Sequence, residues 1–442
     1  MAGPAASQAA GTQSQVLSPW AWELADRLLQ PAAPAEPGWR ASAATGSPSR
    51  LEVLQQLIDQ LQHPSSGQYT GTPADHHTAT RLLHLGGSLL TNPDSDTAAG
   101  LQMLRDRADR LRSDLVGETV TYVVNRNINL TNHCVKHCSF CAFRRDPGEP
   151  GAYRLSRSEL QHKAHEAQRR GATELCIQSG LDPAASLDGS HLAHAETVLS
   201  DLLAAAPGIH LHAFSPQELL FMAEADGLPL QQVLQRLRQA GLASVPGTAA
   251  EVLSEPLRRR LCPEKLSARA WVAVMLEVHA QGLPATSTLM AGHIETAADV
   301  AAHLLTLVAM QRHAWSQGLP GFTEFVLLPF VGLNAPAVLR RQVGRDQPDL
   351  QAMLVLTALA RLLLGPWIRH HQPSWVKLGL EGAAEALRWG ADDLGGTLME
   401  EHITTMAGAS GGTNQEPQAL EAAAARVGRR VRRRNTTYGE LP

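Results

Sequence analysis

One phrase recurs along the chain from residue 120 onward: an amphipathic helical pattern, a glycine, and then a short apolar or β-branched run. A glycine directly after a helix ends it without strain, because it adopts the left-handed backbone conformation readily. The segments that follow resemble buried runs more than clean alternation, which is typical of parallel strands covered on both faces. The phrase occurs strongly at Gly171, Gly208, Gly241, Gly282 and Gly318, and more weakly at Gly390.

The spacing of this phrase predicts a barrel. Successive glycines from Gly171 to Gly318 lie 37, 33, 41 and 36 residues apart, the length of one βα unit. Further strands predicted at Asn127–Thr131 and Ser374–Leu378 bring the number to about eight, which closes most naturally as a TIM-type barrel. We therefore predict an α/β fold, with a (β/α)8 barrel over residues 119–410. A doubly wound sheet is the alternative, but no G-x-G-x-x-G follows the first strand.

The remaining segments differ in composition from the barrel. Residues 1–48 are rich in Ala, Pro and Ser, so we expect a flexible segment without a core. Residues 411–442 are predicted to form a C-terminal helix and basic tail, and we interpret GRRVRRR at Gly428–Arg434 as solvated. Residues 49–118 are predicted to form a helical N-terminal region, with helices at Arg50–Gln62, Thr78–Leu90 and Ala98–Ser113. A segment without a helical pattern, His63–Thr72, separates the first two.

The overall charge and the cysteine usage narrow the functional classes. A net charge of −4 gives no reason to expect a nucleic-acid or anionic-membrane partner. No apolar run reaches the roughly 18 residues of a membrane span, and the amino terminus has no secretory pattern. Five cysteines, three of them clustered, do not resemble a disulfide framework. We therefore expect a cytoplasmic protein.

The cluster of cysteines lies directly after the first predicted strand, at Cys134, Cys138 and Cys141 with the spacing C-x3-C-x2-C. Carboxyl ends of barrel strands are where active sites are built. Thiolates gathered this closely favour a soft metal, yet three are one short of the four ligands of ordinary zinc and iron–sulfur sites. The pattern indicates a metal centre with an open position. A zinc knuckle completed by His133 or His137, or a chance cluster, is the alternative.

At these residues the chain resembles the radical S-adenosylmethionine (SAM) superfamily, whose signature is this loop with an aromatic residue, here Phe140, before the last cysteine. The resemblance implies one [4Fe–4S] cluster on Cys134, Cys138 and Cys141, with SAM bound to the fourth iron. One electron from the cluster then cleaves SAM to methionine and a 5′-deoxyadenosyl radical. An open iron position suits this chemistry, because the same iron holds SAM and passes the electron.

Other positions resemble the cofactor-binding segments of that superfamily. Ser179 and Gly180 end the second predicted strand, where the resemblance implies a turn that receives the SAM amino group; an ordinary βα turn is the alternative. Glu251 matches a carboxylate near SAM, although a glutamate at a helix amino terminus is equally consistent. Gly292 and Glu295, in MAGHIET, resemble an adenine-contacting segment.

Four further cysteine and histidine residues carry weaker predictions. Cys176 lies between apolar neighbours in a strand and is expected in the core. Cys262 follows three arginines, which could lower its pKa, but a structural role is favoured. His210 and His212 alternate on one strand and therefore project to the same side, either toward substrate or as packed core residues.

Longer stretches, including VTYVVNRNINLTNHC and ADDLGGTLMEEHIT, are similar to the tyrosine-dependent subunits of FO synthase over roughly residues 120–408. This resemblance implies cleavage of the tyrosine Cα–Cβ bond and addition of the 4-hydroxybenzyl group to 5-amino-6-(D-ribitylamino)uracil. The other products are 2-iminoacetate, methionine and 5′-deoxyadenosine. A second radical SAM subunit would then close the ring to FO, the deazaflavin chromophore, and a reductase would supply electrons.

The sequence does not identify the residues that contact the substrates, and we assign no catalytic residue. Polar residues near the last strand suit ribityl hydroxyls or, equally, a solvated helix start: Asp392, Asp393, Thr397, Glu400 and Glu401. The rival enzymes are aminofutalosine synthase and cyclic dehypoxanthine futalosine synthase of menaquinone synthesis. The rival from another class is a non-catalytic metal-binding interaction protein.

Overall fold

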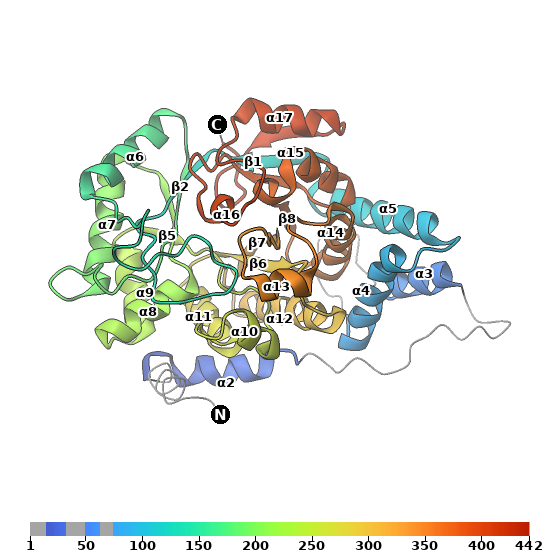
Figure 1. Cartoon of the computed structure of the whole chain (residues 1–442), viewed down its shortest axis with the longest axis horizontal. Coiled ribbons are helices and arrows are strands. Elements are labelled where there is room, and N and C mark those ends of the chain that lie inside the picture. Colours follow the sequence, from blue (N-terminus) through green and yellow to red (C-terminus); the bar gives the residue numbers. More distant parts are fainter. Residues whose placement is uncertain (1–14, 32–48, 62–73, 442) are drawn as a thin grey trace.

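The computed structural model describes residues 15–31, 49–61 and 74–441. Its centre is a closed barrel of parallel strands with helices around it (Figure 1). The barrel strands, in chain order, are β1 (Thr119–Val123), β2 (Asn125–Ile128), β3 (Glu174–Ile177), β4 (His210–Ala213), β5 (Leu242–Ser244), β6 (Ala285–Ala291), β7 (Phe322–Pro329), β8 (His370–Pro373) and β9 (Asp393–Gly396).

Hydrogen bonds close these strands into a ring. One sheet runs β2-β3-β4-β5 and another β6-β7-β8, and a parallel bridge between Val245 and Ala285 joins them. The backbone N–H of Asp392 donates to His371, which brings β9 beside β8, and β9 pairs with β1. Only Val124 separates β1 from β2, so the two act as one long first strand. The predicted (β/α)8 barrel is confirmed and the open doubly wound sheet is excluded.

Helices follow the strands as the repeated glycines predicted. Gly171 and Gly282, for example, have φ values of 79° and 72° directly after helices. The helices from the barrel region onward are α6 (Arg157–Arg169), α7 (His191–Ala205), α8 (Pro216–Asp226), α9 (Leu230–Gln239), α10 (Glu255–Leu261), α11 (Ala268–Ala280), α12 (Ala297–Ser316), α13 (Ala337–Val343), α14 (Leu350–Leu364), α15 (Trp375–Ala386), α16 (Ile403–Met406) and α17 (Pro417–Arg426).

The predicted N-terminal helices form α3 (Arg50–Gln60), α4 (His76–Thr91) and α5 (Thr97–Val116), which lie together against α12 and α14 (Figure 1). Gly86 in α4 permits this approach, because a Cβ there would lie 2.8 Å from a methyl carbon of Leu359. Within the described residues, no helix is long and apolar enough to cross a bilayer.

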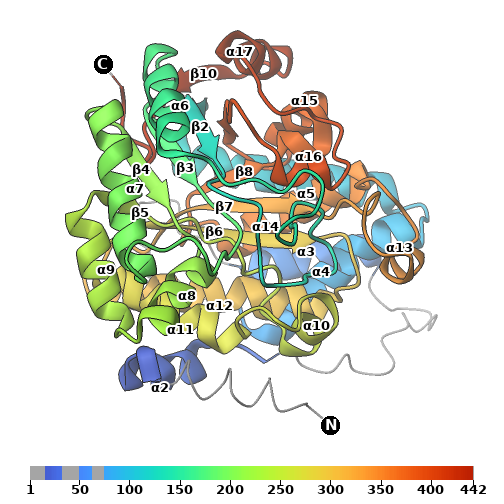
Figure 2. The same ribbon diagram turned by 60° about the vertical axis from the view of Figure 1, so that its left-hand side comes forward.

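Part of the N-terminal segment is ordered, contrary to our expectation for residues 1–48. Residues Pro19–Leu28 form α2, apart from α3–α5 and beside α11 (Figures 1 and 2). The Ser18 N–H donates to Glu277 at 2.6 Å and the Gln30 N–H donates to Thr306 at 3.0 Å, so both ends are tied to the barrel helices. Residues 1–14 and 32–48, and the stretch His63–Thr72, lie outside the described residues.

Two further predictions are wrong. The segment Ser374–Leu378 is not a strand: β8 ends at Pro373 and α15 begins at Trp375. The basic block at 428–434 is not a solvated tail, because Arg430–Arg433 form β10, which pairs in parallel with β1 and lies beside α17 (Figure 2). Two adjacent apolar residues, Trp375 and Val376, resembled a buried strand in the first case, and a run of like charges resembled solvated chain in the second.

The chain after β10 closes the amino-terminal end of the barrel. Arg434 is 2% exposed; its Nε donates to Asp393 at 2.5 Å, and its Nη2 lies 3.3 Å from Glu324. The Tyr438 hydroxyl donates to Glu324 as well, and its ring stacks on His370 with centroids 3.5 Å apart. Because Glu324 and Asp393 stand at the starts of β7 and β9, this network fills the end of the barrel opposite the cysteine loop.

Candidate active site

The cysteine loop leaves the carboxyl end of β2 and is held from several sides. The Arg145 N–H donates to the Asn132 carbonyl at 2.8 Å, which joins the two ends of the loop. Ser139 bonds the Leu261 carbonyl through both its N–H and its hydroxyl, at 3.1 and 2.7 Å. The Val135 N–H donates to Leu181 at 3.0 Å. The loop is thereby fixed between the end of β3 and the end of α10.

Cys134, Cys138 and Cys141 are all free and partly exposed on this loop. Burial raises the pKa of the Cys138 thiol to about 12, against the opposing effect of the nearby Lys265 ammonium. Within the described ranges, no three Cys, His, Asp or Glu side chains are close enough to hold a single metal ion. All three are thiols, the donors that hold iron–sulfur clusters, so the donor set on this loop suits such a cluster.

The two histidines of the loop face carboxylates instead of the thiols. His133 Nδ1 lies 3.3 Å from Asp182, and His137 Nδ1 lies 3.2 Å from Glu264. Neither imidazole is part of a ligand set with the cysteines, so the zinc-knuckle alternative gains no support.

Ser179 and Gly180 pack directly against the cysteine loop. A Cβ on Gly180 would lie 2.1 Å from the His133 carbonyl oxygen, so only glycine fits there. The Gly180 N–H donates to Thr131, and the Ser179 N–H donates to Glu218, both at 2.9 Å. Both N–H groups therefore already have protein partners, and the close approach that requires glycine is to the chain itself.

Glu251 lies on the opposite side of the loop, in an ion pair with Lys265 at 2.5 Å. Although burial disfavours its charged form, the Lys265 ammonium lowers the pKa of Glu251. The Lys265 Nζ stands 5.3 Å from the ring centre of Phe140, within cation–π range. The buried Arg258 bonds the carbonyls of Ala249 and Leu266, at 3.1 and 2.6 Å, which fixes the segments that carry this pair. No motif around Lys265 in the sequence marks it as part of this site.

Cys262 belongs to the same region, which its position in the sequence did not reveal. It is buried in a small apolar cluster with Met290 and Phe330, onto which Cys138 and Phe140 pack. Burial raises the pKa of the Cys262 thiol, so the expected influence of the preceding arginines does not dominate. The predicted structural role is consistent with this setting.

Gly292 and Glu295 form a closed turn after β6. The Glu295 carboxylate accepts the N–H groups of Gly292 and His293, at 2.5 and 2.9 Å. Burial opposes ionisation, yet these bonds and the His293 ring lower the pKa of Glu295 to about 2. Ile294, within the turn, packs on the apolar cluster that also contacts Phe140, so the turn faces the cysteine loop.

His210 and His212 project to the same side, as predicted, and both bond the hydroxyl of Ser244 at 2.7 Å. Strand register aligns Asn127, Cys176, His212 and Ser244 across β2 to β5, so all four lie in one layer of the barrel interior. Burial lowers the pKa of His212 to about 4, so its imidazole is neutral near pH 7. Cys176, which we expected in the core, is only partly buried and belongs to this layer of the barrel interior.

The polar residues near the last strand do not form one cluster. Asp392 binds the buried Arg361 at 2.6 Å and Asp393 binds Arg434, both at the amino-terminal end of the barrel. Glu401 accepts the N–H groups at the start of α16, and Thr397 bonds the Asn125 carbonyl. Of the five, Glu400 lines a pocket near the cysteine loop.

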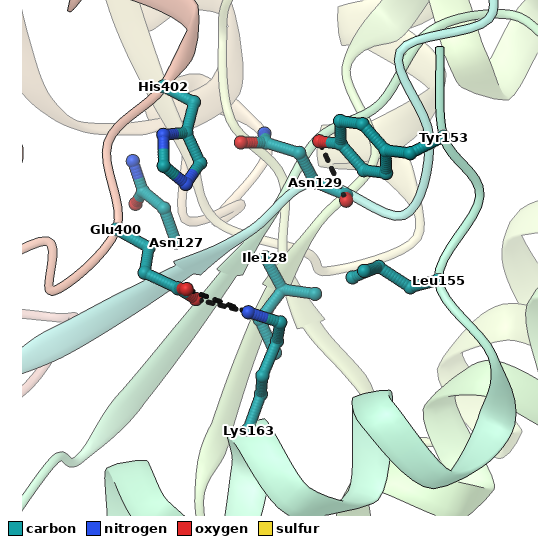
Figure 3. A pocket seen from close by; sticks show the side chains of 8 residues that line it. All are labelled: Asn127, Ile128, Asn129, Tyr153, Leu155, Lys163, Glu400 and His402. Atoms are coloured by element: carbon teal, nitrogen blue, oxygen red, sulfur yellow. Dashed lines mark hydrogen bonds and ion pairs between the residues drawn. The ribbon is translucent and has the colours of Figure 1, made fainter. Parts of the chain in front are cut away.

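This pocket, of about 220 Å³, lies at the carboxyl end of β2 (Figure 3). Figure 3 shows the amides of two asparagines and an imidazole on one side of it, and an ion pair between Lys163 and Glu400, 2.7 Å long, on the other. The Tyr153 hydroxyl donates to the Asn129 carbonyl at 3.3 Å. We call it the β2 pocket; its lining residues are Asn127, Ile128, Asn129, Tyr153, Leu155, Lys163, Glu400 and His402.

Comparison with known proteins decides the family. The radical SAM superfamily pattern matches residues 128–307, and that of the CofH/MqnC C-terminal region matches residues 320–442. A protein of Cyanothece sp. named 5-amino-6-(D-ribitylamino)uracil–L-tyrosine 4-hydroxyphenyl transferase is 53% identical over 379 residues, covering 84% of this chain and 99% of the relative. A protein of the same name from Gloeobacter violaceus is 57% identical, covering 78% and 87%. The chain belongs to this transferase family.

Solved structures support the fold of this 4-hydroxyphenyl transferase family member. Methylornithine synthase aligns with a TM-score of 0.60 at 16% identity, over 86% of this chain and 97% of its own. The FeFe-hydrogenase maturase HydG from Carboxydothermus hydrogenoformans aligns with a TM-score of 0.60 at 15% identity, over 87% and 80%. At these identities the likeness concerns the barrel architecture alone.

Proposed function

We propose that the protein is a radical SAM transferase of FO biosynthesis. It cleaves the Cα–Cβ bond of tyrosine and adds the 4-hydroxybenzyl group to 5-amino-6-(D-ribitylamino)uracil. The other products are 2-iminoacetate, methionine and 5′-deoxyadenosine. The observation that carries this proposal is the 53% identity to a transferase of that name over 99% of its length. The free thiols on the loop after β2 supply the matching chemistry.

In this proposal Cys134, Cys138 and Cys141 hold one [4Fe–4S] cluster, and SAM binds beside it. When bound, the cluster and SAM supply the one-electron chemistry that starts the reaction. The protein orients SAM through surfaces on both sides of the loop, and the Lys265 ammonium offers positive charge next to Phe140. The residues that we assign to cofactor binding are Phe140, Ser179, Gly180, Glu251, Gly292 and Glu295.

The reaction also needs partners. This chain carries one three-cysteine loop, so we expect a second FO synthase radical SAM subunit to close the ring and a reductase to deliver electrons. A cytoplasmic location is consistent with five free cysteines, because thiols persist in a reducing compartment.

The deciding experiment is an anaerobic reaction of the reconstituted protein with tyrosine, the ribitylamino-uracil, SAM and a reductant. We expect an adduct of the uracil and the 4-hydroxybenzyl group by mass spectrometry, together with 5′-deoxyadenosine. Formation of 5′-deoxyadenosine without the adduct would rule out this substrate pair and reopen the menaquinone enzymes, which the CofH/MqnC pattern also covers by name. A protein that bound one zinc and no iron would instead be the non-catalytic metal-binding alternative.

A further inference from the structure

The β2 pocket contains two buried hydrogen-bond acceptors that the protein leaves unpaired. The amide oxygens of Asn127 and Asn129 accept no hydrogen bond from any described residue. Asn129 is 7% exposed, and its amide nitrogen donates to the Gln178 carbonyl at 2.8 Å, which holds the side chain in place. An unpaired buried acceptor costs about 1–3 kcal/mol, so a ligand that donates to both oxygens would be bound favourably.

The charges around the pocket are balanced. The Glu400 carboxylate lies 2.7 Å from both Lys163 Nζ and Arg126 Nη2, and Arg126 Nη1 also binds Glu166 at 2.6 Å. Two cations and two anions leave no net charge to attract an ionic ligand. A zwitterionic amino acid would have to compete with these internal pairs, whereas an uncharged polar group would not. The pocket therefore favours a neutral, donor-rich ligand.

The volume of the β2 pocket and its lining residues limit the kind of ligand that it can bind. Pockets that take a whole drug-sized ligand measure roughly 300–1,000 Å³, so a pocket of about 220 Å³ holds one part of a substrate. Ile128 and Leu155 form an apolar wall, and the two amides with His402 form a polar one. A short carbon chain with hydroxyl groups matches both walls, because each hydroxyl can donate to an amide oxygen while its carbon contacts the aliphatic side chains.

The position of the pocket relates it to the reaction centre. Its Tyr153 belongs to a segment that bonds the base of the cysteine loop: the Thr131 hydroxyl donates to the Tyr153 carbonyl at 2.7 Å, and the Tyr153 N–H donates to Asn132 at 2.8 Å. A side chain anchored here would leave the remainder of its molecule at the carboxyl end of the barrel, beside the cysteines.

We propose that the β2 pocket binds the ribityl side chain of the uracil substrate, with the amide oxygens of Asn127 and Asn129 accepting hydrogen bonds from its hydroxyl groups. The proposal rests on the proposed function for the identity of the substrate. Asn127 and Asn129 are thus the residues that distinguish the ribitylated uracil from the same ring without its polyol.

The test measures substrate constants for the reconstituted full-length enzyme carrying Asn127→Ala. Because the oxygen of Asn127 has no protein partner, its removal breaks no hydrogen bond to it within the described structure. We expect KM for the ribitylamino-uracil to rise about 3- to 10-fold, the range of one neutral hydrogen bond. KM for tyrosine and SAM cleavage without uracil should not change. Inhibition by 5,6-diaminouracil, which lacks the polyol, should be equal in both proteins.

Asn92→Ala, at the end of α4, is the matched control and should leave every constant unchanged. Leu155→Phe, which fills the pocket from its apolar wall, is the second variant if Asn127→Ala loses iron or folds poorly, and it should raise the same KM. An unchanged uracil KM, or an equal rise in the tyrosine KM, overturns the proposal. A wild-type enzyme that forms no adduct at all contradicts the proposed function instead, so the two failures are distinct.

Discussion

Arg434 provides the sharpest test of how the barrel is closed. Its guanidinium binds Asp393 and Glu324 at the buried amino-terminal end, and its Cζ lies 3.9 Å from the ring centre of Tyr438. The substitution Arg434→Met keeps the length of the side chain but leaves two carboxylates without their counter-charge. Breaking a buried pair in this way costs about 3–5 kcal/mol. We expect a loss of that size in the free energy of unfolding, measured at pH 8 by anaerobic urea titration.

Arg432→Met is the matched control on the same strand. Arg432 pairs with Glu440 at the surface, where an ion pair contributes about 0–1 kcal/mol, so this variant should remain close to the wild type. If Arg434→Met lost no more stability than Arg432→Met, the arginine would not be the element that closes the barrel. A triple variant that also carries Asp393→Asn and Glu324→Gln should recover part of the loss, because no uncompensated charge remains.

The same network predicts how the loss of unfolding free energy caused by Arg434→Met depends on pH. Burial raises the pKa of Glu324 to about 7, with Arg434 opposing the rise. The folded protein therefore holds a proton that the unfolded chain releases, and stability from this group is present below about pH 4.5 and is lost as pH rises through 7. Without Arg434 the folded pKa rises further, so the penalty should grow by about 1 kcal/mol between pH 6 and 8. A penalty that shrinks with rising pH would refute this reasoning.

Three further predictions concern the cysteine loop. Gly180→Ala should lower the iron content from near four to below one per chain, because its Cβ would lie 2.1 Å from a loop carbonyl oxygen. The control Gly87→Ala, with open space around its Cβ, should keep the iron. Equal iron contents in the two variants would contradict this prediction. Cys138→Ala should abolish both cluster retention and SAM cleavage, and any turnover by it would overturn the ligand assignment. Lys265→Met should lower the free energy of unfolding by about 3–5 kcal/mol in urea titration, because it leaves the Glu251 carboxylate unpaired. Adding Glu251→Gln should restore most of this loss. Additive losses in the two single variants and the double variant would show that the pair is uncoupled.

The barrel was predictable because its signals are local and repeated. Each glycine after a helix and each apolar run after a glycine reports one βα unit, and Gly171 and Gly282 have the left-handed backbone that this interpretation requires. The error at Ser374–Leu378 has a physical origin. The helix α15 is interrupted by Gly379, whose φ is 70°, and it begins with two adjacent apolar residues, Trp375 and Val376, so its first turn resembled a short buried strand.

Contacts between distant segments could not be predicted in the same way. Arg434 meets Glu324 across 110 residues of chain, and a run of arginines contains no information about a buried partner so far away. Lys265 likewise reaches Phe140 only because α10 and the loop after it fold beside the cysteine loop. The three cysteines, by contrast, could be predicted as ligands, because they lie on one short segment with the spacing C-x3-C-x2-C.

The buried aspartates at the amino-terminal end of the barrel and the buried asparagine oxygens at its carboxyl end differ in whether they have protein partners. At the amino-terminal end, Asp392 and Asp393 each bond a buried arginine, at 2.6 and 2.5 Å, so these charges are satisfied within the chain. At the carboxyl end, Asn127 and Asn129 present amide oxygens that no described residue bonds. Buried charges that are paired within the chain stabilise the fold. Unpaired acceptors beside a pocket can accept hydrogen bonds from a bound ligand. The strand that begins at Thr119 thus spans a sealed end and a binding end, and the cysteine loop continues from the second.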